Sequence, residues 1–276
     1  MNQNKMNYMD YLKTETFPLF WCGGCGNGIV LRAIVRSFAA LGYTREDAVV
    51  VTGIGCWGKA DDYVTTNSFH GTHGRALAFA TGIKLANPKL HVIALMGDGD
   101  GVTIGGNHFI HAARRNVDVT AVLVNNFNYG MTGGQYSGTT PENSITSTSR
   151  YGHIEPEFDI CELAKAAGAP FVARASIDTP LAMEKLITEG LSKKGFSIIE
   201  AIATCPTHFG KNNGKRTAID LMNWINERSV SVAKAKTMDQ GELAGKLIMG
   251  KIADVESEDY GAKYKKLIAA AQSGQN

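Results

Sequence analysis

The feature that most constrains the fold of this chain is a regular alternation of short apolar runs with helix-type segments. The apolar runs lie at 48–55, 91–97, 119–126, 170–175 and 196–203. Runs that are apolar at almost every position are typical of strands buried on both faces. Segments with helical spacing follow or precede them at 27–41, 74–86, 104–115, 159–167 and 179–193. The alternation predicts an α/β fold: a parallel sheet with helices on both faces.

The last part of the chain has a different pattern. Residues 1–216 contain all of the predicted strands, and we expect them to form one domain. Residues 217–276 are rich in charged side chains and carry a mostly helical pattern without an apolar run. We therefore expect a helical C-terminal extension without strands, which docks on a partner.

Composition excludes several classes of function. The 276 residues carry a formal net charge of +2, which gives no basic surface for nucleic acid or for a membrane. No apolar run approaches the ~18–20 residues of a membrane span, and the first twenty residues lack the apolar core of a signal peptide. Five cysteines, an odd number at uneven spacing, argue against a secreted disulfide framework. We expect a cytoplasmic protein.

Polar side chains follow two of the predicted strands where each strand ends. The sequence GDGDG places Asp98 and Asp100 after the strand at 91–97, and Asn126 ends the next strand along the chain. One strand–helix–strand unit therefore brings Asp98 and Asn126 side by side. Carboxylate and amide oxygens with a nearby carbonyl are ligands that suit Mg²⁺. The following loop, NYGMTGGQ, offers backbone N–H groups and Thr132 to a diphosphate.

A dinucleotide-binding fold is the competing interpretation of these glycines. The stretch TGIGCWG has the G-x-G-x-x-G spacing with Gly53, Gly55 and Gly58. That fingerprint requires a helix that opens directly after it. The residues after Gly58 do not have a helical pattern, so we expect no helix there and do not favour this alternative.

The cysteines suggest a metal or redox site. Cys22 and Cys25 form a CxxC pair among glycines, Cys56 ends a strand, and Cys205 follows the last strand and precedes a proline. Four thiolates can hold an iron–sulfur cluster or zinc. The spacing favours the cluster, and zinc, a redox pair or a plain turn remain as alternatives. Cys161 lies in a helical pattern and is expected to be a core residue.

Six motifs in order resemble the β subunits of 2-oxoacid:ferredoxin oxidoreductases: WCxGCGNG, TGIGC, HGRALAFATGIKLA, GDGDG followed by IGGNHFIHAARRN, NNFNYGMTGGQ and the late Cys-Pro. The resemblance covers about residues 18–215. It implies a thiamine diphosphate-binding fold with thiamine diphosphate, Mg²⁺ and one [4Fe–4S] cluster. It places the cluster on Cys22, Cys25, Cys56 and Cys205, and Mg²⁺ on Asp98, Asn126 and the Asn128 carbonyl. The cofactor-binding residues that it implies are Ile54, Gly55, Cys56, His73, Gly97, Asp98, Gly99, Asp100, Asn126, Asn128, Gly130, Met131 and Thr132.

The resemblance also implies the reaction and its partners. Members of this family oxidatively decarboxylate a 2-oxoacid with coenzyme A and pass the electrons to ferredoxin, and the reverse carboxylation also occurs. The stretch GIGCWGKADDYVTTNSFHGTHGR is similar to the subgroup that converts 2-oxoglutarate to succinyl-CoA. Enzymes for pyruvate or branched-chain 2-oxoacids share every cofactor motif. A non-redox thiamine diphosphate enzyme with a zinc site is a further alternative.

Three side chains are candidates for catalysis. Resemblance to the HGR motif places His73 near the diphosphate or the reacting carbon, with His70 nearby, and Lys59 could pair with a substrate carboxylate or with coenzyme A. The glutamate that activates thiamine diphosphate comes from the other subunit in this family. We therefore expect an obligate α subunit, in an α₂β₂ complex.

Overall fold

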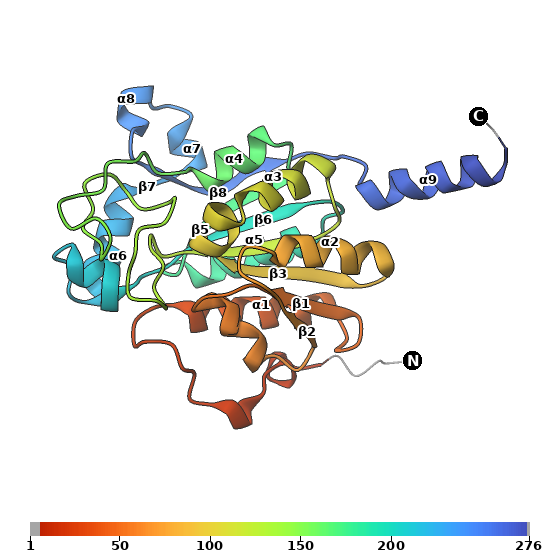
Figure 1. Cartoon of the computed structure of the whole chain (residues 1–276), viewed down its shortest axis with the longest axis horizontal. Coiled ribbons are helices and arrows are strands. Elements are labelled where there is room, and N and C mark those ends of the chain that lie inside the picture. Colours follow the sequence, from red (N-terminus) through yellow and green to blue (C-terminus); the bar gives the residue numbers. More distant parts are fainter. Residues whose placement is uncertain (1–5, 275–276) are drawn as a thin grey trace.

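An eight-stranded sheet with helices on both faces forms the centre of this chain, in a computed structural model that describes residues 6–274 (Figure 1). The strands are β1 (Ala48–Thr52), β2 (Asn67–His70), β3 (His91–Gly97), β4 (Thr120–Asn125), β5 (Phe171–Ser176), β6 (Ser197–Ile202), β7 (Ser229–Ser231) and β8 (Leu247–Asp254). The α-helices are α1 (Asn27–Leu41), α2 (Ala76–Ala86), α3 (Gly106–Arg115), α4 (Ile160–Ala166), α5 (Pro180–Ser192), α6 (Ala218–Arg228), α7 (Val232–Ala235), α8 (Gln240–Leu243) and α9 (Tyr260–Gln272). Shorter 3-10 or π turns are η1 (Tyr8–Tyr11), η2 (Thr14–Thr16), η3 (Trp57–Tyr63), η4 (Gly99–Ile104) and η5 (Pro206–Gly210).

The strand order places the candidate motifs on one edge of the sheet. The order is β2-β1-β3-β4-β6-β5-β8-β7, and the first six strands are all parallel. After β1 the chain passes to β2 on one side, and β3 then pairs with the other side of β1. Ligands of open α/β sheets bind at the carboxyl ends of the strands beside such a reversal. The ends of β1, β3 and β4 therefore meet at the expected binding position.

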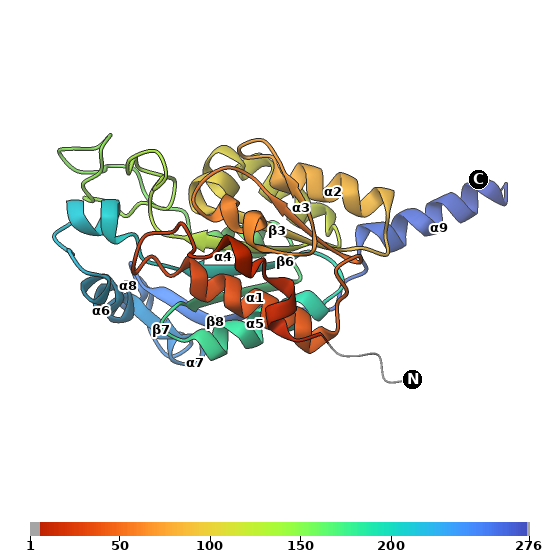
Figure 2. The ribbon, with the colours of Figure 1, turned by 90° about the horizontal axis from the view of Figure 1, so that it is seen from below.

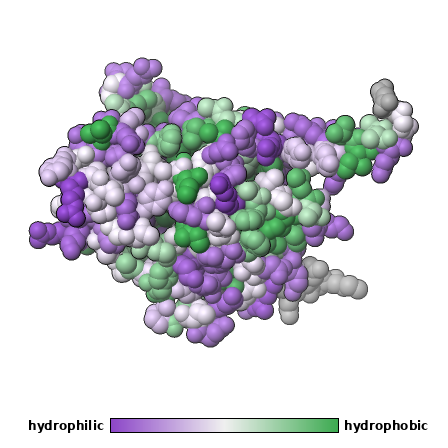
Figure 3. Space-filling view, viewed as in Figure 1, coloured by the Kyte–Doolittle hydropathy of each residue, from purple (hydrophilic) through white to green (hydrophobic). Residues whose placement is uncertain are grey.

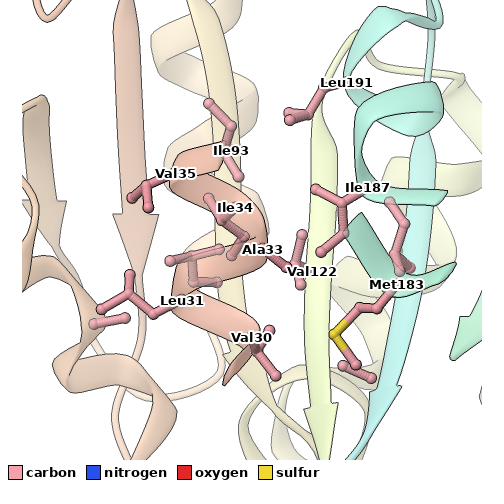
Figure 4. Close-up of a cluster of buried hydrophobic side chains, with 14 of the residues drawn as sticks. Val30, Leu31, Ala33, Ile34, Val35, Ile93, Val122, Met183, Ile187 and Leu191 are labelled. Carbon is pink, nitrogen blue, oxygen red and sulfur yellow. The ribbon is translucent and has the colours of Figure 1, made fainter. Parts of the chain in front are cut away.

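Two apolar layers bury the sheet, as its continuous apolar strands predict. On one face α1 and α5 pack together, and α2, α3 and α4 cover the other face (Figure 2). Figure 4 shows Val30 and Ile34 of α1 in one buried cluster with Ile93 and Val122 of the sheet and Ile187 of α5. These buried α1 residues recur at helical spacing, which is why this segment forms a helix against the sheet.

The expectation that residues 217–276 contain no strand is wrong. The short β7 follows α6, and β8 pairs antiparallel with β5 and so extends the main sheet. The burial of β8 is partial at most positions, so its sequence lacks the continuous apolar run that identifies the inner strands. The division of the chain into two domains at residue 216 stays a prediction.

The segment after Gly58 also differs from its expectation. Residues Trp57–Tyr63 form the 3-10 turn η3, and the exposed strand β2 follows at Asn67–His70. A helical turn therefore does follow TGIGC, and the expectation that no helix opens there, which counted against a dinucleotide-binding fold, is wrong. The side chains of β2 are all exposed, so no apolar pattern marked it as a strand.

Helix α9 projects from the body of the molecule at its C-terminal end (Figure 1). Tyr264, Leu267 and Ile268 are exposed on it, and hydrophobic residues are visible along this arm in the space-filling view (Figure 3). Within residues 6–274, none of the helices is both long and apolar enough to cross a bilayer.

Candidate cofactor site

The carboxyl ends of β1, β3 and β4 enclose a cavity of about 130 Å³. Every cofactor-binding residue that the sequence predicts lines this cavity. Four segments contribute: the turn after β1, the loop before α2, the GDGD turn after β3 and the loop after β4. The lining residues are Ile54, Gly55, Cys56, Trp57, His73, Gly97, Asp98, Gly99, Asp100, Val124, Asn126, Asn128, Tyr129, Gly130, Met131 and Thr132.

Asp98 is buried, and its two carboxylate oxygens face different partners. Oδ2 accepts hydrogen bonds from the Ser137 hydroxyl at 2.5 Å and the Thr139 hydroxyl at 2.7 Å. These two bonds leave Oδ1 facing the Asn126 side chain. Burial raises the pKa of Asp98 to about 6, although the two hydroxyl groups act in the opposite direction. The carboxylate is thus ionised at neutral pH at a cost that a cation would offset.

The side-chain amide of Asn126 lies between Asp98 Oδ1 and the Asn128 carbonyl oxygen. The Asn126 side-chain oxygen lies 3.3 Å from Asp98 Oδ1 and 2.8 Å from the Asn128 carbonyl oxygen, and its other neighbour is the Asn128 N–H at 3.4 Å. Neighbouring oxygens around an octahedral Mg²⁺ are ~2.9 Å apart, since each lies about 2.1 Å from the ion. With its nitrogen on this side, the amide donates to both oxygens; a bound cation would require the amide oxygen on this side instead. The donor set therefore fits Mg²⁺.

The loop after β4 presents backbone donors to the same cavity. Within residues 6–274, the N–H groups of Gly130, Met131 and Thr132 have no protein acceptor, and all three residues line the cavity. Consecutive unpaired N–H groups favour an anion such as a diphosphate. The Thr132 hydroxyl, which was also predicted to contact the diphosphate, instead donates to Gln135 Oε1 at 2.7 Å.

Asp100 holds the histidine of the HGR motif. Its Oδ1 lies 2.6 Å from His73 Nδ1 and accepts from the N–H groups of Gly74 at 2.7 Å and Ile54 at 3.2 Å. This leaves the other ring nitrogen of His73 available to the cavity. Gly53 makes the arrangement feasible, since a Cβ there would lie only 2.1 Å from Asp100 Oδ2.

The other two candidates for catalysis lie outside the lining of the cavity. His70 ends β2, where its Nδ1 contacts Asp61 at 2.9 Å and the Thr52 hydroxyl at 3.1 Å. Lys59 lies on η3 and forms an ion pair with Asp62 at 2.5 Å. Lys59 is partly exposed, so its side chain can exchange this partner for another anion.

A second cavity of about 310 Å³ brings together four of the five cysteines. Cys22, Cys25, Cys56 and Cys205 line it, and Cys161 lies elsewhere in the buried core, as predicted. This cavity adjoins the first, because Cys56, Asn126, Gly130 and Met131 line both. The Cys205 thiol also contacts Asn128 Oδ1 at 3.7 Å.

The four thiols line one cavity, where they could share a metal ion or a cluster. Zinc needs its sulfur ligands about 2.3 Å from one point. A four-iron cluster instead occupies the space between its thiolates. Burial raises the pKa of Cys25 and of Cys56 to about 11, and the neighbouring thiols add to the shift. Thiolates here would therefore need a cationic group between them.

Two glycines shape the CxxC turn through their backbone conformation. Gly24 and Gly26 both have φ near +82°, a region that favours glycine. A Cβ would also lie 2.6 Å from Ala218 at Gly24 and 2.4 Å from Ile177 at Gly26. These glycines thus serve the turn and its close packing.

The sequence did not identify three side chains that complete the first cavity. Ser137 and Thr139 hold Asp98 from a loop without regular structure, and the Tyr129 hydroxyl donates to the Gly99 carbonyl at 3.1 Å. The serine and threonine lie among many similar residues at 137–149, so no spacing distinguished them. Tyr129 stands inside the NYGMTGGQ segment and could have been selected as a neighbour of Asn128.

Comparison with known proteins gives consistent matches. Residues 53–201 match the thiamine pyrophosphate enzyme, C-terminal TPP binding domain. The 2-oxoglutarate synthase subunit KorB of Methanothermobacter marburgensis is 47% identical over 254 residues, 92% of this chain and 89% of that protein. The subunit of the same name from Archaeoglobus fulgidus is 56% identical over 204 residues, covering 74% and 76% of the two chains.

A solved structure is similar over the whole chain. It is the 2-oxoglutarate:ferredoxin oxidoreductase from Magnetococcus marinus with 2-oxoglutarate, coenzyme A and succinyl-CoA bound. The TM-score is 0.86 at 29% identity, and the match covers 100% of this chain and 93% of that one.

Proposed function

Because the chain belongs to the KorB family of 2-oxoglutarate synthase subunits, we propose that it binds thiamine diphosphate in a 2-oxoglutarate:ferredoxin oxidoreductase. The enzyme converts 2-oxoglutarate and coenzyme A to succinyl-CoA and CO₂, and two electrons leave to ferredoxin. The observation that carries this proposal is the pair of adjoining cavities. One is lined by the Mg²⁺ and diphosphate motif, and the other by four cysteines.

The residues of the first cavity divide the binding of the cofactor between them. Asp98, Asn126 and the Asn128 carbonyl would hold Mg²⁺, and the N–H groups at 130–132 would bind the diphosphate oxygens. When bound, thiamine diphosphate supplies the carbanion chemistry that releases CO₂ from a 2-oxoacid. His73, fixed by Asp100, is oriented to hold or move a proton at its free ring nitrogen.

The second cavity supports the assignment of a [4Fe–4S] cluster to Cys22, Cys25, Cys56 and Cys205. Cys56 lines the thiamine diphosphate cavity, and the Cys205 thiol lies 3.7 Å from Asn128 Oδ1 in the loop after β4. The cluster and the thiamine diphosphate would therefore lie next to each other. That proximity is what one-electron transfer from a cofactor to a cluster requires. Five free cysteines among the described residues agree with a reducing, cytoplasmic location.

A partner subunit completes the site in this proposal. Asp98 and Asp100 are the carboxylates among the cavity-lining residues, and both are already engaged. No glutamate of residues 6–274 lines the cavity, so the activating glutamate would come from an α subunit in an α₂β₂ complex. In the same complex Lys59 would exchange Asp62 for the distal carboxylate of 2-oxoglutarate or for coenzyme A.

The decisive experiment is turnover of the co-expressed complex with a viologen dye as electron acceptor. We expect 2-oxoglutarate to be oxidised in a reaction that needs coenzyme A, with pyruvate and a branched-chain 2-oxoacid as comparison substrates. Preference for pyruvate or for the branched-chain 2-oxoacid would overturn the assignment of 2-oxoglutarate as the substrate. A colourless complex that contains zinc and decarboxylates 2-oxoacids without reducing the dye would overturn the redox function. The chain without its partner should be inactive.

A further inference from the structure

A buried ion pair joins two neighbouring strands of the sheet. Arg174 of β5 and Glu200 of β6 are register partners on neighbouring strands, and 2% and 1% of their side chains are exposed. Arg174 Nε donates to Glu200 Oε2 at 2.7 Å, and Arg174 Nη2 donates to Asp159 at 2.6 Å. Burying such a pair costs more than apolar side chains would. Its presence in an otherwise apolar part of the sheet therefore calls for a specific role.

The ion pair continues as a chain of hydrogen bonds to the proposed Mg²⁺ site. Glu200 Oε1 accepts from Asn125 Nδ2 at 2.8 Å, which fixes the orientation of the Asn125 amide. Asn125 Oδ1 lies 3.1 Å from the Thr139 hydroxyl, and this hydroxyl lies 2.7 Å from Asp98 Oδ2. Asp98 and Asn125 therefore share the single proton of Thr139. Each link of the chain is buried.

The same amide holds the turn that aims the other two Mg²⁺ ligands. Asn125 Oδ1 accepts from the Phe127 N–H at 3.0 Å. Phe127 has φ of 65°, a strained value for a residue with a side chain. This turn carries Asn126 on one side and Asn128 on the other. If Asn125 rotated its amide, the Phe127 N–H would face a donor and the turn would lose the bond that stabilises its strained backbone.

We propose that Glu200, held by Arg174, is a positioning residue that sets the Asn125 amide and through it the Mg²⁺-binding turn of the thiamine diphosphate site. This inference rests on the proposed function. Glu200 touches neither cation nor cofactor. It acts by accepting from Asn125, which only a carboxylate can do while it also accepts from Arg174 and from the Cys161 thiol at 3.3 Å. Burial raises the pKa of that thiol, so Cys161 stays a neutral donor.

The test exchanges the donor and the acceptor across the Glu200–Asn125 contact. In Glu200→Gln, the new amide must face Arg174 with its oxygen and Asn125 with its nitrogen, so Asn125 must rotate. In the double variant Asn125→Asp/Glu200→Gln, the aspartate accepts from the glutamine on one side and from Phe127 and Thr139 on the other. Each bond is thereby kept. Glu184→Gln is the control, because it breaks the ion pair between Arg36 and Glu184, 2.6 Å apart, on α1 and α5.

The measurement is the Mg²⁺ concentration that half-saturates thiamine diphosphate binding to the co-expressed complex, by calorimetry, together with Tm. We expect Glu200→Gln to raise the half-saturating Mg²⁺ concentration about tenfold or more. The double variant should return this concentration to within about threefold of the parent value. The control should lower Tm and leave the Mg²⁺ requirement unchanged. A purely structural pair would lower Tm in both Glu200 variants without this rise and recovery.

Three results would overturn the inference. The first is a Glu200→Gln complex whose Mg²⁺ requirement stays within about twofold of the parent. The second is a double variant that assembles but is not restored, and the third is a double variant that does not assemble. If Glu200→Gln alone fails to assemble, the double variant decides. A parent complex that binds no thiamine diphosphate with Mg²⁺ would overturn the proposed function, and the inference with it.

Discussion

At the scale of single residues, Asp98 decides whether the first cavity can bind a cation. One oxygen accepts from two hydroxyl groups, and the other faces the side chain of Asn126. We predict that Asp98→Asn in the complex weakens Mg²⁺-dependent thiamine diphosphate binding by at least about a hundredfold, since it removes the anionic ligand. Calorimetry measures this. Asp118→Asn, at the opposite end of the sheet beside Lys84, should lower Tm and leave the affinity unchanged.

The raised pKa of Asp98 predicts a pH dependence with a definite sign. Burial raises this pKa to about 6 in the absence of a cation, so below pH 6 Mg²⁺ must displace a proton. The apparent Mg²⁺ affinity should be constant above that pH and fall about tenfold per unit below it. Without a cation, ionised Asp98 destabilises the fold as pH rises through about 6. Mg²⁺ with thiamine diphosphate should therefore raise Tm more at pH 7.5 than at pH 5, and an equal rise at both would refute the assignment.

Substitution of Gly53 tests whether Asp100 must stay in place to hold His73. A methyl group at residue 53 would lie 2.1 Å from Asp100 Oδ2 and 2.6 Å from its Cγ. Gly53→Ala should therefore displace Asp100 and lower kcat about a hundredfold, with a loss of stability of about 1–3 kcal/mol. Gly82→Ala on α2 is the matched control, because nothing lies within 4 Å of its Cβ. Unchanged turnover in Gly53→Ala would show that turnover does not depend on the position of Asp100.

Residues with a fixed spacing could be predicted, and residues without one could not. Asp98 and Asn126 follow two strands whose ends must meet at one edge of the sheet, so the topology alone places them together. Ser137 and Thr139 reach Asp98 only through the path of a long loop, and Glu200 reaches Asn125 only through the register of β6. No pattern in the sequence encodes either. Lys59 is a candidate partner for a substrate carboxylate or coenzyme A from the sequence, and in the structure it pairs with Asp62.

At the scale of elements, burial decides which strands a sequence reveals. Strands β1, β3, β4, β5 and β6 are buried at nearly every position, and each was predicted from its apolar run. Strand β2 is exposed throughout, and β8 is buried only in part. Both lie toward the edges of the sheet, where backbone pairing rather than side-chain burial holds a strand. This explains why residues 217–276 appeared to lack a strand.

The two ends of the C-terminal extension should differ in their contribution to stability. Deletion of 247–276 removes β8, leaves β5 as an unpaired edge and takes away the Ile248 carbonyl that Arg174 contacts at 3.4 Å. We expect an insoluble chain or a Tm lower by more than about 10 °C. Deletion of 265–276 removes the distal part of α9 and the residues after it, together with the exposed ion pair between Lys266 and Glu258. It should change Tm by no more than about 2 °C. Thermal unfolding of the assembled complex measures both.

At the scale of the whole molecule, the fold joins cysteines that are far apart in sequence. Cys22 and Cys25 come from the turn before α1, Cys56 from the end of β1 and Cys205 from the end of β6. The cavity between them exists only when these parts of the chain have assembled. It opens beside the thiamine diphosphate cavity because both use the carboxyl edge of the sheet. The grouping of the four thiols is therefore a consequence of topology rather than of the CxxC pair alone.

Substitution of single cysteines separates a cluster site from a chance grouping of thiols. We expect the anaerobically purified complex to be brown, with broad absorption and about four irons per chain at this site. Cys56→Ser or Cys205→Ser should remove most of this iron and abolish dye reduction, because each deletes one of four ligands. Cys161→Ser is the matched control. Its thiol is buried against Glu200 outside the second cavity, so iron content should be unchanged even if Tm falls. Equal iron loss in all three variants would show that the thiols affect folding rather than hold a cluster.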